Sequence, residues 1–296
     1  MTDFLRLLLA VFLSASAAAE TLVATHDPVP DPAYPASVVE LTFSSAGDRM
    51  PGFIYIASGE GPHPTVLLLH GFPGNEKNLD IAQSARRAGF NVVFFNYRGA
   101  WGADGSYSLL GQDEDVQSVL GFFREPVNSK KYRVDTSHLT LLGHSLGGFT
   151  ALATARADAR LACVGALSPV NLALWKAGIA AEDATAKRLL PYADQLFMLA
   201  DFDGEAMREQ LSVAIADEID TRGFGPDLVG RSVLLVVGEQ DDVTPAATMF
   251  DPVVAAYAKV DMLRLESHKI PGDHSFSSSR LALSRIVLDW LQRDCR

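Results

Sequence analysis

The chain has 296 residues, of which 48% are hydrophobic and 21% are charged, a composition that excludes a disordered chain and a polytopic membrane protein. Its 36 acidic residues outnumber its 25 basic ones and give a net charge of −11, which argues against nucleic acid as a partner because phosphate backbones are bound by a surplus of lysine and arginine. The length permits one domain with a single large core.

The first 19 residues have the pattern of an export signal. Arg6 precedes a short apolar run over residues 7–13, and three alanines at 17–19 stand before Glu20 as a cleavage site of small residues. The apolar run is shorter than the roughly 20 residues that a membrane-spanning helix needs. We therefore predict a signal peptide over residues 1–19, export to the periplasm or the medium, and no stable membrane insertion. An uncleaved membrane tether is the alternative.

From residue 37 onward, apolar stretches alternate with amphipathic helical ones. The first two apolar stretches alternate with polar residues on either side of Gly47, which predicts a β-hairpin. The later ones are continuously apolar, as in buried parallel strands. Repeated strand-helix units imply a doubly wound, mostly parallel sheet in one α/β domain over residues 20–296. The predicted strands cover residues 37–43, 52–57, 65–69, 91–96, 139–142, 162–167, 232–237 and 262–265, and the predicted helices cover residues 78–88, 112–123, 146–157, 246–259 and 278–292.

The stretch 171–230 interrupts this alternation with amphipathic helical sequence. It is too long for a plain connection between two strands and too short for a separate core. We predict that it forms a helical cap over the edge of the sheet at which the strands end. Additional helices packed beside the sheet are the alternative.

The strongest motif is the hexapeptide GHSLGG at residues 143–148. It follows the predicted strand 139–142 directly and opens the predicted helix 146–157, which is the strand-turn-helix setting of a nucleophile elbow. Glycines two positions before and after Ser145 let neighbouring backbone pass close to this tight turn. The pattern therefore predicts Ser145 as a catalytic nucleophile, with an ordinary helix-capping serine in a glycine-rich turn as the alternative.

A serine nucleophile needs a base and a third group that orients the base. Asp241 and Asp242 follow the strand predicted at 232–237, and His274 follows the last predicted strand. Because loops after parallel strands share one edge of the sheet, these groups are the candidates for acid and base. His268 is the rival base, but it stands closer to the end of the predicted strand, in a segment that is still extended.

The oxyanion that forms during acyl transfer needs preorganised N–H donors. The backbone N–H of Leu146, directly after the nucleophile, is the first candidate, and that of Phe72 in the loop HGFPG is the second. Tyr97 and Trp101 are candidates for the substrate pocket, with packing against the cap as the alternative. The side chain of His144 is expected to point away from Ser145. The metal-binding spacings HExxH and CxxC do not occur, and no metal or cofactor is expected.

Five segments together resemble the α/β-hydrolase superfamily over residues 37–292: HGFPG, NYRGAWG, GHSLGG, GEQDDVTP and GDHSF, in this order. The resemblance implies the α/β-hydrolase fold and a triad of Ser145, Asp241 and His274. Asp241 is preferred to Asp242 because the acid of this superfamily usually stands three residues after the glycine that ends its strand, here Gly238. The segment NYRGAWG resembles the corresponding loop of prolyl-oligopeptidase-like peptidases and acyl esterases.

These residues predict a hydrolase that cleaves small carboxylic esters through an acyl-enzyme intermediate on Ser145. An acyl-peptide hydrolase or amidase and a thioesterase use the same triad and are the alternatives within the superfamily. A catalytically silent fold that serves as a binding module is the alternative outside it. Nothing in the sequence predicts an oligomeric state.

Cys163 and Cys295 are the two cysteines of the chain. Cys163 is expected at the start of a parallel strand, and Cys295 at the end of a helix that runs antiparallel to the strands. Both positions belong to the same end of the sheet, so in an exported protein the two residues either form a disulfide or remain buried thiols.

Overall fold

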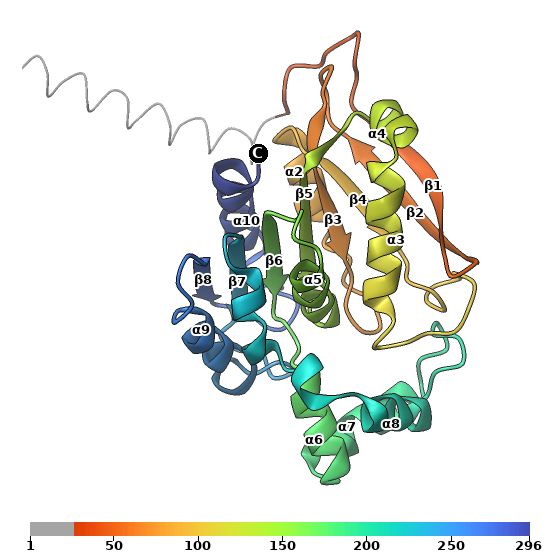
Figure 1. Ribbon diagram of the computed structural model, residues 1–296, viewed down its shortest axis with the longest axis vertical. Coiled ribbons are helices and arrows are strands. Elements are labelled where there is room, and N and C mark those ends of the chain that lie inside the picture. Colours follow the sequence, from red (N-terminus) through yellow and green to blue (C-terminus); the bar gives the residue numbers. More distant parts are fainter. Residues whose placement is uncertain (1–26) are drawn as a thin grey trace, which may run out of the picture.

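The computed structural model describes residues 27–296, and the predicted signal peptide lies outside the described residues. Figure 1 shows a central sheet with helices on both faces and a further group of helices at one end. The sheet has eight strands in the order β1-β2-β4-β3-β5-β6-β7-β8. The strands are β1 (Ser37–Ser45), β2 (Asp48–Ile56), β3 (His63–Leu69), β4 (Asn91–Phe95), β5 (Val134–His144), β6 (Cys163–Leu167), β7 (Ser232–Gly238) and β8 (Arg264–Ile270).

The strands from β3 to β8 are parallel to their neighbours, and only the hairpin β1–β2 and its pairing with β4 are antiparallel. The central strands β4, β6 and β7 are buried along their whole length, as expected for parallel strands covered on both faces. The predicted α/β-hydrolase fold with a mostly parallel, doubly wound sheet is thus confirmed.

Two layers of helices cover the faces of the sheet. Alternate residues of β3 divide between two hydrophobic clusters, with Leu67 facing one layer and Leu68 the other. One layer holds α2 and α10, and the other holds α3, α5 and α9. The helices that flank the sheet are α2 (Leu79–Arg87), α3 (Gln112–Arg124), α4 (Pro126–Tyr132), α5 (Leu146–Ala157), α9 (Asp251–Tyr257) and α10 (Arg280–Asp294).

The predicted bounds of the last strand, residues 262–265, are wrong. Met262 has a positive φ of 64° and belongs to a turn, and β8 begins at Arg264 and continues to Ile270. This edge strand is rich in polar residues and half exposed, so the short apolar run before it is a poor marker of its position. His268, the rival candidate for the base, lies within β8 and pairs with Glu266 at 2.7 Å.

Two smaller differences concern helices. The predicted helix 246–259 begins as a π-helical turn over Ala246–Phe250 and continues as α9. The short helix α4 was not predicted; it is largely polar and begins with Pro126 in its first turn, a position that suits proline because the missing N–H has no partner there.

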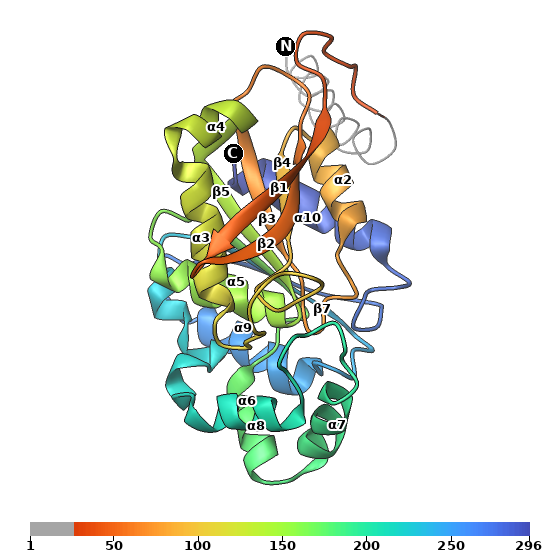
Figure 2. The ribbon, with the colours of Figure 1, turned by 90° about the vertical axis from the view of Figure 1, so that its right-hand side faces the viewer.

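The interrupting stretch forms α6 (Leu172–Ala180), α7 (Ala184–Ala193) and α8 (Gly204–Val213), followed by three 3-10 turns, Ala216–Glu218, Thr221–Gly223 and Gly225–Leu228. Figures 1 and 2 show α6, α7 and α8 grouped at one end of the molecule, and in Figure 1 this group lies beyond the ends of β6 and β7. This is the position predicted for a cap. None of the helices between residues 27 and 296 is both long enough and apolar enough to cross a bilayer.

Cys163, the first residue of β6, is joined to Cys295, which follows α10, by a disulfide with a Cα–Cα distance of 5.8 Å. The bond decides between the two states that the sequence left open. It ties the last helix to a central strand across a sequence separation of 132 residues, and both cysteines are buried.

We expect the double change Cys163→Ala and Cys295→Ala to lower the free energy of unfolding by about 4 kcal/mol. The disulfide restricts the conformations of the unfolded chain, and without it the unfolded chain has a higher entropy. The melting temperature should fall by roughly 10 °C. Thermal unfolding of both proteins, with and without reductant, checks this prediction, and the double variant should not respond to reductant. Equal melting temperatures for wild type and variant would contradict it.

Candidate active site

Ser145 occupies the turn between β5 and α5, with backbone angles of φ 57° and ψ −120°. Few residues with a side chain adopt such angles, and they persist only where the surroundings enforce them. Here the N–H of Ser145 donates to Leu167 O at 2.8 Å, and its carbonyl accepts from the N–H groups of Gly148 and Phe149 at 3.0 and 3.2 Å. The turn is therefore held by backbone contacts on both sides.

Glycines around Ser145 are required by close backbone approach. A Cβ atom on Gly143 would lie 1.9 Å from the carbonyl oxygen of Gly147, and one on Gly147 would lie 2.3 Å from that of Leu69. A Cβ atom on Gly71 would lie 2.8 Å from the Cβ of Ser145. The loop after β3 thus packs directly against the Ser145 side chain. N–H groups that stabilise an oxyanion have to lie beside the nucleophile, and this loop is in that position.

Asp241 and His274 are hydrogen-bonded, with Nδ1 of the imidazole 2.8 Å from Oδ2 of the carboxylate. The Asp241 side chain is fully buried, whereas Asp242 is exposed. Of the two candidate acids, the structure places Asp241 beside the imidazole and Asp242 on the surface. With Nδ1 turned to the acid, Nε2 of His274 is left free to act as a base toward the serine.

The carboxylate of Asp241 receives further hydrogen bonds from the residues that follow it. Its Oδ1 accepts from the N–H groups of Val243 at 2.9 Å and Thr244 at 2.8 Å, and its Oδ2 accepts from the hydroxyl of Thr244 at 2.7 Å. Burial alone would raise the pKa of Asp241, but the bonds from His274 and Thr244 outweigh it and hold the pKa well below its ordinary value. Asp241 is ionised at neutral pH.

Sequence reasoning missed Thr244. Its hydroxyl lies 3.4 Å from Nδ1 of His274 as well as in contact with Asp241, so it holds the acid and borders the base. The signal available in the sequence is its spacing, three residues after the acid, which is the spacing at which a backbone N–H returns to an aspartate side chain.

Ser145 and His274 line the same small cavity, of about 170 Å³. Its wall also includes the loop after β3, Ser275 beside the imidazole, and one residue of the cap, Tyr192 on α7. The triad residues thus meet at the edge of the sheet where β5, β7 and β8 end, as their positions after strands predict.

His144 is bonded to the loop that carries the base. Its Nε2 lies 2.8 Å from the backbone carbonyl oxygen of His274, and the two rings are 4.8 Å apart. Burial lowers the pKa of His144 to about 3, so the ring is neutral and donates this hydrogen bond at neutral pH. His70 is buried in the same way, with its pKa lowered to about 4 by burial, and its Nδ1 bonds to the carbonyl of Gly71 at 2.8 Å.

We expect the fold to lose stability as the pH falls below 6.5, the ordinary pKa of histidine. Because the pKa values of His144 and His70 are lowered by folding, the unfolded chain takes up their protons first. Each buried ring therefore lowers the free energy of unfolding by about 1.4 kcal/mol for each pH unit by which the pH falls, from pH 6.5 down to the pKa of that ring in the folded protein. Urea unfolding at pH 7.5 and 5.0 should show a smaller loss for His144→Gln than for wild type. The control His138→Gln, at a partly exposed histidine, should retain the wild-type loss.

The loop after β3 carries the predicted oxyanion donor Phe72, which lines the cavity. Two aromatic residues hold this loop: Nε1 of Trp101 donates to the carbonyl of Pro73 at 2.7 Å, and the hydroxyl of Tyr97 donates to that of His70 at 3.4 Å. Neither Tyr97 nor Trp101 is among the residues that line the cavity, and Tyr97 is buried. Both residues position the backbone of the loop, and their role as pocket residues stays a prediction.

The family model described as "Alpha/beta hydrolase family" matches residues 66–280 of the chain, which contain Ser145, Asp241 and His274. The chain is a member of the alpha/beta hydrolase family. The resemblance noted in the sequence is thereby confirmed, and the eight-stranded, mostly parallel sheet with its flanking helices agrees with this family's fold.

Among curated relatives, the alpha/beta hydrolase described here is similar to the esterase EstD of Thermotoga maritima, with 31% identity over 132 residues, 42% of this chain and 31% of EstD. The matches to curated relatives cover less than half of the length of those proteins.

Two solved structures have a similar fold. Est1E of Butyrivibrio proteoclasticus with bound ferulic acid has a TM-score of 0.62 at 15% identity, covering 86% of this chain and 98% of its own. The acylaminoacyl peptidase of Pyrococcus horikoshii has a TM-score of 0.62 at 14% identity, covering 88% of this chain and 42% of its own. At these identities the likeness concerns the fold.

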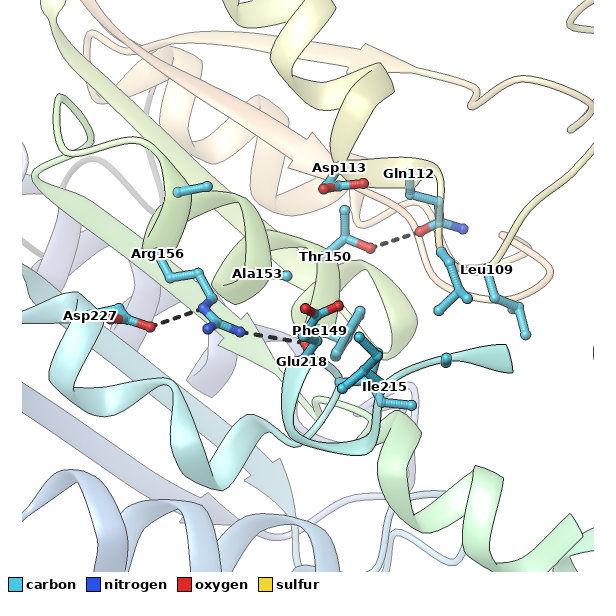
Figure 3. Close-up of a pocket in the computed structure, with 14 residues that line it drawn as sticks. Leu109, Gln112, Asp113, Phe149, Thr150, Ala153, Arg156, Ile215, Glu218 and Asp227 are labelled. Carbon is cyan, nitrogen blue, oxygen red and sulfur yellow. Dashed lines mark hydrogen bonds and ion pairs between the residues drawn. The ribbon is translucent and has the colours of Figure 1, made fainter. Parts of the chain in front are cut away.

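A second, larger hollow of about 520 Å³ lies beside α5 in this alpha/beta hydrolase (Figure 3). Its wall comes from the loop before α3, the outer side of α5 and the segment of the cap that returns to the sheet. Arg156 within it is paired with Asp227 at 3.0 Å. Ser145, Asp241 and His274 do not line it. The smaller cavity, which Ser145 and His274 line, is therefore the candidate active site.

Metal-ligating side chains are not clustered in the part of the chain that the structure describes: no group of three or more histidine, cysteine, aspartate or glutamate residues there is arranged to hold a metal ion. The groups gathered around Ser145 are those of acid-base and nucleophilic chemistry.

Proposed function

We propose that this protein is a serine hydrolase that cleaves carboxylic esters of small molecules through an acyl-enzyme. The observation that carries the proposal is the alignment of three groups: Ser145 on its strained turn, His274 lining the same cavity, and the buried carboxylate of Asp241 2.8 Å from the imidazole. The esterase EstD among the relatives supports an ester as the substrate.

In the first half of the proposed reaction, the Ser145 hydroxyl oxygen attacks the ester carbonyl carbon and gives its proton to Nε2 of His274. Backbone N–H groups of Phe72 and Leu146 stabilise the oxyanion. The imidazolium, held by Asp241, returns the proton to the alcohol oxygen as the bond to the acyl group breaks, and the alcohol leaves.

In the second half, a water molecule takes the place of the alcohol. His274 accepts a proton from this water as the water oxygen attacks the acyl carbon. The imidazolium then returns the proton to the oxygen of Ser145 as the acid is released. The ionised state of Asp241 suits both halves, because its charge stabilises the imidazolium that forms in each. No cofactor enters the reaction.

The test is turnover of a matched butyryl series: p-nitrophenyl butyrate, butyryl p-nitroanilide and a butyryl thioester, together with labelling of Ser145 by a fluorophosphonate. We expect labelling, with ester turnover well above that of the anilide and the thioester. Turnover of the anilide alone would replace the esterase with an amidase or acyl-peptide hydrolase, and preference for the thioester would make the protein a thioesterase. Absence of both turnover and labelling would favour a silent fold.

We further propose that the protein is exported to the periplasm or the medium after removal of residues 1–19. The disulfide between Cys163 and Cys295 supports this proposal, because such bonds persist in oxidising compartments. Expression of the full chain, fractionation and N-terminal sequencing should find a mature chain that begins at Glu20 outside the cytoplasm. Recovery of the intact chain from the cytoplasm or in membranes would contradict it.

A further inference from the structure

The cavity at Ser145 is small. Its volume of about 170 Å³ is below the range of about 300–1,000 Å³ that is typical of pockets for drug-sized ligands. Only a short part of a substrate therefore fits between the serine and the cap.

Tyr192 on α7 contributes the cap side of the cavity wall. Its ring lies against that of Phe72 in an edge-to-face arrangement, with centroids 6.0 Å apart and an interplanar angle of 80°. Tyr192 retains 39% of its exposure. The Tyr192 side chain thus lines the cavity, packs against Phe72 and remains partly exposed to solvent.

On its other sides, Phe72 is packed against further aromatic residues. Its ring also contacts Tyr107 at 6.1 Å, Trp175 at 6.2 Å and Phe202 at 5.6 Å, and these three side chains are buried between the core and the cap. A longer acyl chain directed toward the cap would have to displace this packed aromatic cluster. Tyr192 is the most exposed member of this cluster and lines the cavity beside Phe72.

The helix that carries Tyr192 is anchored to the loop of the catalytic acid. Nη1 of Arg188 donates to the carbonyl of Asp242 at 3.0 Å, and its Nη2 donates to that of Val243 at 3.4 Å. Arg188 precedes Tyr192 by four residues, so both side chains lie on the same side of α7. The anchor thus fixes the tyrosine relative to Asp241 and His274.

We propose that Tyr192 is a specificity-determining residue that restricts the acyl group of the ester to short chains, because the cavity whose cap side it forms is smaller than pockets for drug-sized ligands. This inference rests on the proposed ester hydrolysis and deepens it by naming the class of substrate. The cap selects short acyl groups with an aromatic wall, and the acid loop holds that wall in place.

The experiment compares kcat/KM for p-nitrophenyl acetate, butyrate, octanoate and dodecanoate in wild type, Tyr192→Ala, Tyr192→Phe and Ile215→Trp. Wild type should prefer butyrate over octanoate by about tenfold or more, and Tyr192→Ala should lower this ratio by about tenfold, since wall contacts with single methylene groups discriminate 10- to 200-fold. Tyr192→Phe retains the ring and should retain the ratio. Ile215→Trp enlarges a residue of the larger hollow and should leave the ratio unchanged.

Three results would overturn the inference: equal turnover of butyrate and octanoate by wild type, an unchanged ratio in Tyr192→Ala, or a loss of octanoate turnover in Ile215→Trp, which would place the acyl chain in the larger hollow. If the alanine variant melts before the assay temperature, Tyr192→Val provides the same test. Absence of turnover of every ester would refute the proposed function itself, whereas turnover without chain-length preference would refute only the role of Tyr192.

Discussion

Replacing Ser145 with alanine is expected to lower kcat/KM for p-nitrophenyl butyrate by about 10⁵-fold, because the nucleophile and the covalent route through the acyl-enzyme are lost together. Residual turnover above that in buffer should remain, since the oxyanion donors and the cavity are unchanged. The measurement is initial-rate kinetics combined with fluorophosphonate labelling, which should disappear in the variant.

The control for this change is Ser212→Ala, at an exposed position on the cap helix α8, which should keep both activity and labelling. Alanine at 145 retains the Cβ atom that packs against the loop at Gly71, so the melting temperature should stay close to that of wild type. A folded Ser145→Ala variant that keeps more than a tenth of the activity would refute Ser145 as the nucleophile.

The positions of Ser145, Asp241 and His274 were predictable from the sequence because each residue follows a strand. Ser145 follows β5, Asp241 follows β7 and His274 follows β8, and the ends of parallel strands meet at one edge of a sheet. The strands themselves are readable because the central ones are continuously apolar. The wrong bounds of the last strand do not affect the prediction for His274, because both the predicted and the observed strand end before this residue.

The supporting residues were less predictable because their roles depend on contacts between distant segments. Tyr97 and Trp101 follow β4 and were expected in the pocket, but their polar atoms bond to the backbone of the loop after β3. Tyr192 on the cap lines the same cavity as Ser145, and no periodic pattern in the sequence shows which side of a cap helix packs against the core. His144 binds the carbonyl of His274, 130 residues away.

The change Asp241→Asn is expected to lower kcat by about 10⁴-fold, because the imidazole loses the charge that stabilises its protonated form and the acceptor that selects its tautomer. The same change at the neighbouring Asp242 should alter kcat less than threefold, since the exposed side chain there contacts neither the base nor the cavity. Steady-state kinetics of the two variants on p-nitrophenyl butyrate make the comparison, with Asp242→Asn as the matched control.

Asp241→Asn should also lower stability at neutral pH. The pKa of Asp241 is lower in the folded chain than its ordinary value of 3.8, so its ionised form stabilises the fold above that pH, and this contribution is lost as the pH falls through the folded pKa. The difference in melting temperature between wild type and Asp241→Asn should therefore be present at pH 7 and shrink below pH 4. If both variants are folded and Asp242→Asn loses more kcat than Asp241→Asn, Asp242 is the acid. A difference in stability between two folded variants would not produce that result.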